Sequence, residues 1–165
     1  PPTMRILAVA PACNNDVTGL EPPSNPASET FAPSLGVNVP QMTKLANGTY
    51  IQDITIGTGA EVVTQTDTVW LTYAGFLKDG TLFDSGTNTR FEPTKVIRGF
   101  GTGIVGMKVG GERLLVIPSE MGYGPETKRN PLTNKITIPR QSTLVFRVTL
   151  LRLHTPSTTG TGTTA

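Results

Sequence analysis

Cysteine and histidine are almost absent from this chain, which has one of each among its 165 residues. A single cysteine excludes a disulfide framework and any metal site built from a cysteine cluster. The one histidine, His154, lies at the end of the last apolar segment, where we expect a solvated or capping side chain. Histidine-rich metal sites and most catalytic triads are thereby excluded, and we expect no metal and no other cofactor.

Phosphate loops, paired carboxylates and basic clusters are missing as well. The glycines at 101, 103, 110 and 111 lack the spacing of a phosphate loop and its following Lys-Ser/Thr pair. The net charge is only +2, and the basic residues are scattered without interleaved aromatics, so nucleic acid is not an expected partner. The chain has no run of 18 apolar residues, so the sequence predicts no transmembrane helix. An enzyme with this sequence would need neither a nucleophile nor an acid–base pair.

Proline and glycine are abundant, and the prolines gather at the N-terminus: eight of the 14 lie in residues 1–40. Residues 1–43 show no sustained apolar period, so we expect a disordered, proline-rich tether there. Residues 155–165 are rich in threonine and glycine and are expected to be a disordered tail. The predicted folded domain is therefore residues 44–154.

The first residues resemble a bacterial lipoprotein signal. Met4-Arg5 precedes the apolar residues 6–10, and Pro11-Ala12-Cys13 follows, with Cys13 as the candidate lipid-bearing residue. The apolar run is shorter than the usual 7–15 residues, and Ala10 stands where that signal usually has leucine. The alternative is an incidental apolar patch. We expect a periplasmic or cell-envelope protein, with the cytoplasm as the alternative.

From residue 50 onward the pattern changes to short β-rich segments separated by turns. Strands are predicted at residues 50–56, 69–73, 114–117 and 143–151, and Asp79-Gly80 predicts a hairpin with a type I′ turn. A short helix fits between Arg98 and Met107, although its glycines should weaken it. The pattern favours an α+β fold, a curved antiparallel sheet of four to six strands with one short helix on a face.

Six motifs in order resemble the FKBP-type peptidyl-prolyl cis/trans isomerases, the macrolide-binding immunophilins. The resemblance covers residues 45–153, and it implies a bent five- or six-stranded antiparallel sheet wrapped around a short helix. The motifs begin with Tyr73-Ala74-Gly75 running through Phe83-Asp84-Ser85. The others are Val96-Ile97-Arg98-Gly99-Phe100, Gly106-Met107-Lys108-Val109-Gly110-Gly111, Gly122-Tyr123-Gly124, Ile138-Pro139 and Thr143-Leu144-Val145-Phe146.

The resemblance implies a pocket that binds the prolyl ring. Phe100 would form its floor, the Ile97 amide and the Tyr123 hydroxyl would bind carbonyl groups, and Asp84 would sit at the rim. The residues implied in catalysis are Tyr73, Phe83, Asp84, Ile97, Phe100, Tyr123 and Phe146. Those implied in substrate binding are Phe91, Val96 and Ile138. Seen singly, most of these would be ordinary interior residues.

Two departures from the family pattern concern the pocket rim. The segment from Phe83 to Val96 is short, which trims one wall, and Arg90 is a candidate partner for Asp84. Residues 125–137 form a longer, basic loop that would overhang the pocket mouth. It would select acidic or extended clients, or serve simply as a solvated surface loop.

Three functions are compatible with this sequence. The first is a peptidyl-prolyl isomerase that helps exported proteins fold. The second is a chaperone or docking module that binds proline-containing peptides without catalysis, and the third is a structural or adhesion domain. Proline-containing polypeptides, and macrolides resembling FK506 or rapamycin, are the implied partners. A monomer is expected, because no heptad repeat is visible.

Overall fold

The computed structural model describes residues 22–156, which form a six-stranded antiparallel sheet, a separate two-stranded sheet, a short helix and several single turns. The strands are β1 (Thr43–Lys44), β2 (Tyr50–Thr55), β3 (Thr68–Leu77), β4 (Leu82–Phe91), β5 (Glu112–Ile117), β6 (Lys128–Arg129), β7 (Ile136–Ile138) and β8 (Leu144–His154). The α-helix is α2 (Arg98–Gly103). Single 3-10 turns are η2 (Pro26–Ser28), η3 (Pro33–Leu35), η4 (Val39–Gln41), η5 (Pro93–Lys95) and η6 (Ser119–Met121).

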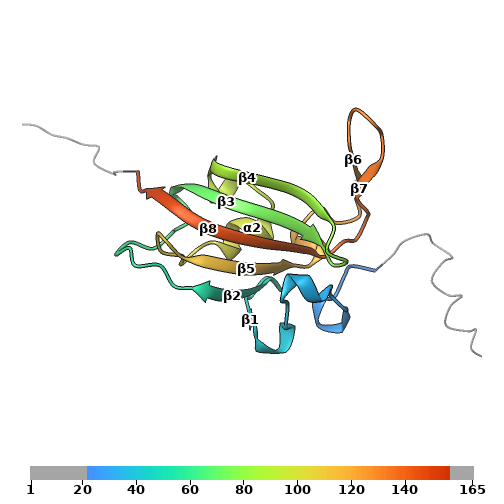
Figure 1. The fold of residues 1–165 in the computed structure, drawn as a ribbon, viewed down its shortest axis with the longest axis horizontal. Coiled ribbons are helices and arrows are strands. Elements are labelled where there is room, and N and C mark those ends of the chain that lie inside the picture. Colours follow the sequence, from blue (N-terminus) through green and yellow to red (C-terminus); the bar gives the residue numbers. More distant parts are fainter. Residues whose placement is uncertain (1–21, 157–165) are drawn as a thin grey trace, which may run out of the picture.

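Six strands form the main sheet in the order β1-β2-β5-β8-β3-β4, with every neighbouring pair antiparallel. β8 lies at the centre between β5 and β3, and α2 lies against one face of the sheet (Figure 1). This arrangement confirms the predicted α+β fold with one short helix.

Both faces of the sheet carry buried apolar side chains, and successive side chains of a strand point alternately to one face and the other. On β5, Leu115 and Ile117 face the helix side, while Leu114 and Val116 face the other. The helix-side cluster also contains Phe100, Ile104 and most of the buried residues of β3 and β8. Two separate clusters therefore hold the sheet, and only the helix-side cluster contributes residues to the cavity described below.

Glycines let α2 lie directly on its neighbours. A Cβ at Gly103 would collide with Leu115 of β5, and a Cβ at Gly101 would collide with the carbonyl oxygen of Pro93. The sequence suggested only that these glycines weaken the helix; the structure shows that they also permit its close approach. Burial against the sheet offsets the low helix propensity of glycine.

Arg113 on β5 closes the C-terminal end of this helix. Its side chain is buried, and Nη1 donates 2.8 Å hydrogen bonds to the carbonyl oxygens of Gly103 and Val105. Nε donates to Oδ1 of Asp53 on β2 at 2.7 Å. The guanidinium thus satisfies carbonyls that a helix terminus leaves without internal partners, and it ties the helix to the neighbouring strands.

The N-terminal segment, residues 22–42, packs on the outer face of the sheet, which is the face opposite α2. Leu35, Val39 and Met42 are buried there against Tyr50 and Val145. The N–H of Ala32 also donates to the carbonyl of Lys78 at 2.8 Å. The prediction of disorder is therefore wrong for residues 22–43. It gave too much weight to the prolines, three of which lie at the first or second position of 3-10 turns, where a missing N–H costs little.

The hairpin between β3 and β4 has a different turn from the one predicted. The Gly80 N–H bonds the Leu77 carbonyl, and Leu77 N–H bonds the Thr81 carbonyl, both at 2.9 Å. Gly80 alone in this turn has a positive φ, of 92°. The loop therefore has three residues, 78–80, and ends on a left-handed glycine, instead of the two-residue type I′ turn.

The predicted signal, with Cys13, and most of the predicted tail lie outside the described residues. Within residues 22–156, no helix combines the length and the apolar character needed to cross a membrane. The basic loop at 125–137 contains the small hairpin β6–β7, which projects from the sheet (Figure 1). Leu132 near its tip is 93% exposed.

Candidate active site

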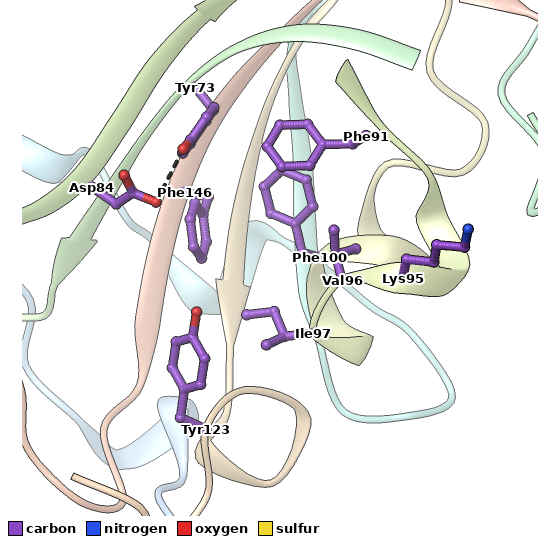
Figure 2. Close-up of a pocket in the computed structure, with 9 residues that line it drawn as sticks. All are labelled: Tyr73, Asp84, Phe91, Lys95, Val96, Ile97, Phe100, Tyr123 and Phe146. Atoms are coloured by element: carbon purple, nitrogen blue, oxygen red, sulfur yellow. Dashed lines mark hydrogen bonds between the residues drawn. The ribbon is translucent and has the colours of Figure 1, made fainter. Parts of the chain in front are cut away.

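An aromatic cavity of about 330 Å³ opens between the sheet, α2 and the segment after η6 (Figure 2). β3, β4 and β8 supply four of its residues, the η5–α2 corner supplies four more, and one follows η6. The cavity is lined by Tyr73, Asp84, Phe91, Lys95, Val96, Ile97, Phe100, Tyr123 and Phe146.

Phe100 is the buried centre of the aromatic cluster, with 3% of its surface exposed. Its ring centroid lies 5.0 Å from that of Phe146 and 5.5 Å from that of Phe91, and 6.3 Å from that of Tyr73. The Phe146 and Tyr73 rings meet it close to edge-on, an arrangement that aromatic pairs favour. These contacts fix the Phe100 ring at the bottom of the cavity, as a rigid apolar floor.

Local backbone geometry determines where this floor lies. Ile97 caps the N-terminal end of α2, and its carbonyl accepts hydrogen bonds from the N–H groups of Phe100 and Gly101 at 3.1 and 3.0 Å. The corner before the helix presents Val96 and Ile97 to the cavity. In Figure 2, Ile97 lies between Phe100 and Tyr123.

A tyrosine and a carboxylate form the polar side of the cavity. The hydroxyl of Tyr73 donates a 3.0 Å hydrogen bond to Oδ2 of Asp84 (Figure 2). Burial, together with this hydrogen bond, raises the pKa of Tyr73 to about 12. Tyr73 is therefore a neutral phenol at physiological pH, and its proton is directed at Asp84 instead of at a ligand.

Tyr123 lies at the opposite side of the opening from Tyr73 (Figure 2). The ammonium of Lys128 lies 4.8 Å from its ring centroid, within the range of a cation–π contact. Lys128 is also paired with Glu126 at 2.7 Å, an ion pair that raises the pKa of the lysine. The base of the projecting hairpin thereby contacts the ring that borders the cavity.

Eight of the ten residues singled out from the sequence line the cavity. The structure does not place the other two, Phe83 and Ile138, on its surface. Phe83 packs edge-on against Phe146, with the ring centroids 5.5 Å apart, and Ile138 is buried in the helix-side cluster. The roles assigned to all ten remain predictions.

Two details of the rim differ from the sequence analysis. Arg90 pairs with Glu92 at 3.0 Å, whereas Asp84 accepts the Tyr73 hydroxyl. Lys95 lines the cavity although sequence reasoning missed it, and its position just before Val96-Ile97 was the only available signal. Its ammonium is directed away from the aromatic rings (Figure 2) and pairs with Glu92 at 2.9 Å.

The cavity suits one compact apolar ring flanked by peptide groups. Its rings exclude water from the floor, and the Tyr123 hydroxyl provides a polar group at the opening. Within the part of the chain that the structure describes, no three His, Cys, Asp or Glu side chains gather as a metal site. A six-stranded antiparallel sheet, one short helix and an aromatic cavity between them define an α+β protein with a candidate binding site for an apolar ring.

Comparisons with known proteins agree with this class. Residues 59–151 match the family model of the FKBP-type peptidyl-prolyl cis-trans isomerases. An FK506-binding protein of Neisseria meningitidis serogroup B is 39% identical over 113 residues, which are 65% of this chain and 97% of that protein. FK506-binding protein 4 of Chaetomium thermophilum is also 39% identical, over 73% of this chain and 23% of that protein.

Solved structures share the fold. The peptidyl-prolyl cis-trans isomerase of Pseudomonas syringae superposes with a TM-score of 0.61 at 31% identity, covering 70% of this chain and 82% of that one. FkpA of Escherichia coli gives a TM-score of 0.59 at 35% identity, covering 69% of this chain and 52% of that one. The chain belongs to the FKBP-type peptidyl-prolyl cis-trans isomerase family. It is accordingly a peptidyl-prolyl isomerase that takes proline-containing substrates.

Proposed function

We propose that the cavity above Phe100 is the active site, where an X-Pro bond of a polypeptide client rotates between cis and trans. The observation that supports this most directly is the buried Phe100 ring enclosed by Phe146, Phe91 and Tyr73. The floor they form can hold a prolyl ring while the rest of the peptide passes over the rim.

The physical basis is the polarity of the amide. Rotation about an X-Pro bond is opposed by a barrier of about 18–20 kcal/mol, because the planar amide is stabilised by resonance. That resonance separates charge, which water favours, and the twisted transition state loses it. An apolar cavity therefore destabilises the planar amide relative to the twisted one. Lowering the barrier by about 5 kcal/mol accelerates rotation by nearly four powers of ten.

In this proposal the residues bind and orient the substrate, and none exchanges a proton with it. Phe100 holds the prolyl ring, and the Ile97 amide and the Tyr123 hydroxyl donate to substrate carbonyls. Asp84 fixes the Tyr73 ring by accepting a hydrogen bond from its hydroxyl. Phe83 supports the wall through its edge-on contact with Phe146.

The test is a protease-coupled isomerisation assay with Leu-Pro and Phe-Pro tetrapeptides, with and without FK506. The variants are Phe100→Ala, Phe100→Leu and Tyr123→Phe. Tyr50→Phe is the matched control, because it also removes a tyrosine hydroxyl, but from a residue on the opposite face of the sheet. Circular dichroism checks folding, since a buried Phe→Ala change costs roughly 3–5 kcal/mol of stability.

We expect turnover that FK506 inhibits in the wild type and in Tyr50→Phe. Folded Phe100 variants should lose most of the rate, Phe100→Ala more than Phe100→Leu. A folded Phe100→Ala protein with the full wild-type rate would contradict the active-site assignment. A folded wild type that binds prolyl peptides without accelerating rotation would favour the chaperone or docking alternative.

We also propose that FK506-like macrolides occupy the same cavity, and that the isomerase is a monomer acting on exported proteins in a bacterial periplasm or cell envelope. Two relatives are named for binding FK506, which supports the first point. Residues 6–13 support the location through their resemblance to a lipoprotein signal. Incorporation of labelled palmitate into the wild type but not into Cys13→Ser would support a lipid anchor; equal labelling would contradict it.

A further inference from the structure

Ser24 and Ser119 are joined by a reciprocal pair of hydrogen bonds. The N–H of Ser24 donates to Oγ of Ser119 at 2.8 Å, and the N–H of Ser119 donates to Oγ of Ser24 at 2.8 Å. Ser119 has no exposed surface, so its atoms in both hydrogen bonds are shielded from solvent. The two residues are 95 positions apart, and their bonds attach the N-terminal segment to the turn η6.

The same Ser119 organises the backbone on both sides of Tyr123. Its carbonyl accepts the N–H of Gly122 at 3.0 Å and the N–H of Gly124 at 2.8 Å. All of its backbone groups are thus engaged, either with Ser24 or with the two glycines that flank Tyr123. A movement of Ser119 would therefore be transmitted to the tyrosine ring at the cavity opening.

A third hydrogen bond connects Ser24 with the residue before β8, the strand that carries Phe146. The Thr143 hydroxyl donates to Oγ of Ser24 at 2.7 Å, and Thr143 is 2% exposed immediately before β8 begins at Leu144. The Ser24 hydroxyl thus accepts one hydrogen bond from each of two chain segments that border the cavity. Losing that oxygen would leave a buried N–H and a buried hydroxyl without their acceptor.

We infer that Ser24 is a positioning residue of the isomerase: it holds the segment around Ser119 so that the Tyr123 hydroxyl stays at the cavity opening. This inference rests on the proposed function of the cavity. It assigns a functional role to a residue that precedes residues 59–151, the segment that matches the family model. Ser24 contacts no substrate in this scheme, and its effect on the Tyr123 hydroxyl passes through Ser119.

The test compares Ser24→Ala with Ser24→Thr, which retains a hydroxyl, and with the control Ser28→Ala. Ser28 belongs to the same segment, is exposed, and its hydroxyl bonds only the nearby Asn25 carbonyl among the contacts the structure gives it. In the isomerisation assay, Ser24→Ala should lower kcat/KM by about three- to tenfold. The loss should appear in KM, because a carbonyl contact helps bind planar and twisted amides alike.

A double-mutant cycle identifies the route of the effect. In a Tyr123→Phe background, Ser24→Ala should change kcat/KM by less than about twofold, because the hydroxyl that it positions is already gone. Ser24→Thr should restore most of the rate. A variant that merely lowered the folded fraction would reduce the apparent kcat in both backgrounds and leave KM unchanged, and that pattern would overturn the inference.

Amide hydrogen exchange provides a readout that does not depend on catalysis. Exchange at Gly122 and Gly124 should be faster in Ser24→Ala than in the wild type or in Ser28→Ala. Unchanged exchange at both glycines would overturn the positioning role even if activity fell. An inactive wild type would instead refute the proposed function, and the exchange rates would still decide whether Ser24 anchors this segment.

Discussion

The hydroxyl of Tyr73 on β3 and the carboxylate of Asp84 on β4 are joined by a 3.0 Å hydrogen bond on the polar side of the cavity. The pair crosses from one strand of the hairpin to the other, so it fixes the tyrosine ring against Phe91, with the ring centroids 5.3 Å apart. The acid therefore acts on the shape of the cavity through the tyrosine, without transferring a proton.

Replacing Asp84 with Asn should lower the pKa of Tyr73 from about 12 towards the ordinary value of 10. The fall should be partial, because burial is the larger cause of the raised pKa and it remains. Since the folded-state pKa is raised, Tyr73 contributes stability that is fully present below about pH 10 and lost as the pH rises through about 12. In Asp84→Asn the loss should begin near the same pH but end at a lower pH and be smaller than in the wild type, because the folded-state pKa lies closer to the ordinary value.

Tyrosinate absorbance during an alkaline titration measures this shift, and Tyr73→Phe identifies the signal among the three tyrosines. An unchanged titration in Asp84→Asn would show that the hydrogen bond does not hold the proton on Tyr73.

Replacing Gly101 with Ala should destabilise the protein by roughly 1–3 kcal/mol, because the new methyl group collides with the Pro93 carbonyl. Helix propensity alone predicts the opposite sign, since alanine is favoured over glycine by about 1 kcal/mol. Urea denaturation decides between the two. Arg98→Ala, an exposed position of the same helix, is the control and should stay within about 0.5 kcal/mol. A more stable Gly101→Ala protein would contradict the close approach of α2 to η5.

Replacing Leu35 with Ala should cost roughly 2–4 kcal/mol of unfolding free energy, because Leu35 is buried between the N-terminal segment and the sheet. Thermal or urea unfolding measures the loss. Leu132→Ala removes the same atoms from a 93% exposed position and should change stability by less than about 0.5 kcal/mol. Equal stabilities for the two variants would mean that the N-terminal segment does not pack in solution.

Replacing Arg113 with Lys should destabilise the protein by roughly 2–4 kcal/mol although the charge is kept, because an ammonium cannot contact Asp53 and two helix carbonyls with the same planar geometry. The control is Arg147→Lys, whose half-exposed ion pair with Glu112 should contribute less than about 1 kcal/mol. Urea unfolding of both variants gives the comparison. A loss as small as that of the control would rule out Arg113 as a cap of α2.

The sequence predicted the cavity well because its residues belong to ordered motifs on strands and on one short helix. Phe100 and Phe146 lie far apart in the chain, yet their motifs fixed which elements carry them, and their rings meet at 5.0 Å. It was harder to predict which aromatic residues line the cavity itself. Nothing in the chain distinguishes Phe146, which lines the cavity, from Phe83, which contacts Phe146 without lining the cavity.

The N-terminal segment could not be placed because its composition and its pattern disagree. Prolines and small polar residues there are typical of a linker, but the apolar residues Leu35, Val37 and Val39 alternate in a way that suits packing on a flat apolar surface. That surface exists only once β2, β5 and β8 have paired, so local reasoning had nothing to pack the segment against. Lys95 was not predicted as a cavity residue for a similar reason, since its place on the rim depends on the corner between η5 and α2.

Because residues 22–42 cover apolar side chains on the outer face of the sheet, they also affect the solubility of the protein. Without residues 22–42, the side chains of Leu114, Val116, Val145 and Phe76 would form an apolar area on a pleated surface, the kind that invites association between copies. The N-terminal segment fills that place within the same molecule, and does so through side-chain packing without extending the sheet. A shortened chain that retains every cavity residue would therefore be expected to aggregate, and protein made for crystallisation or inhibitor screening should begin before Pro22.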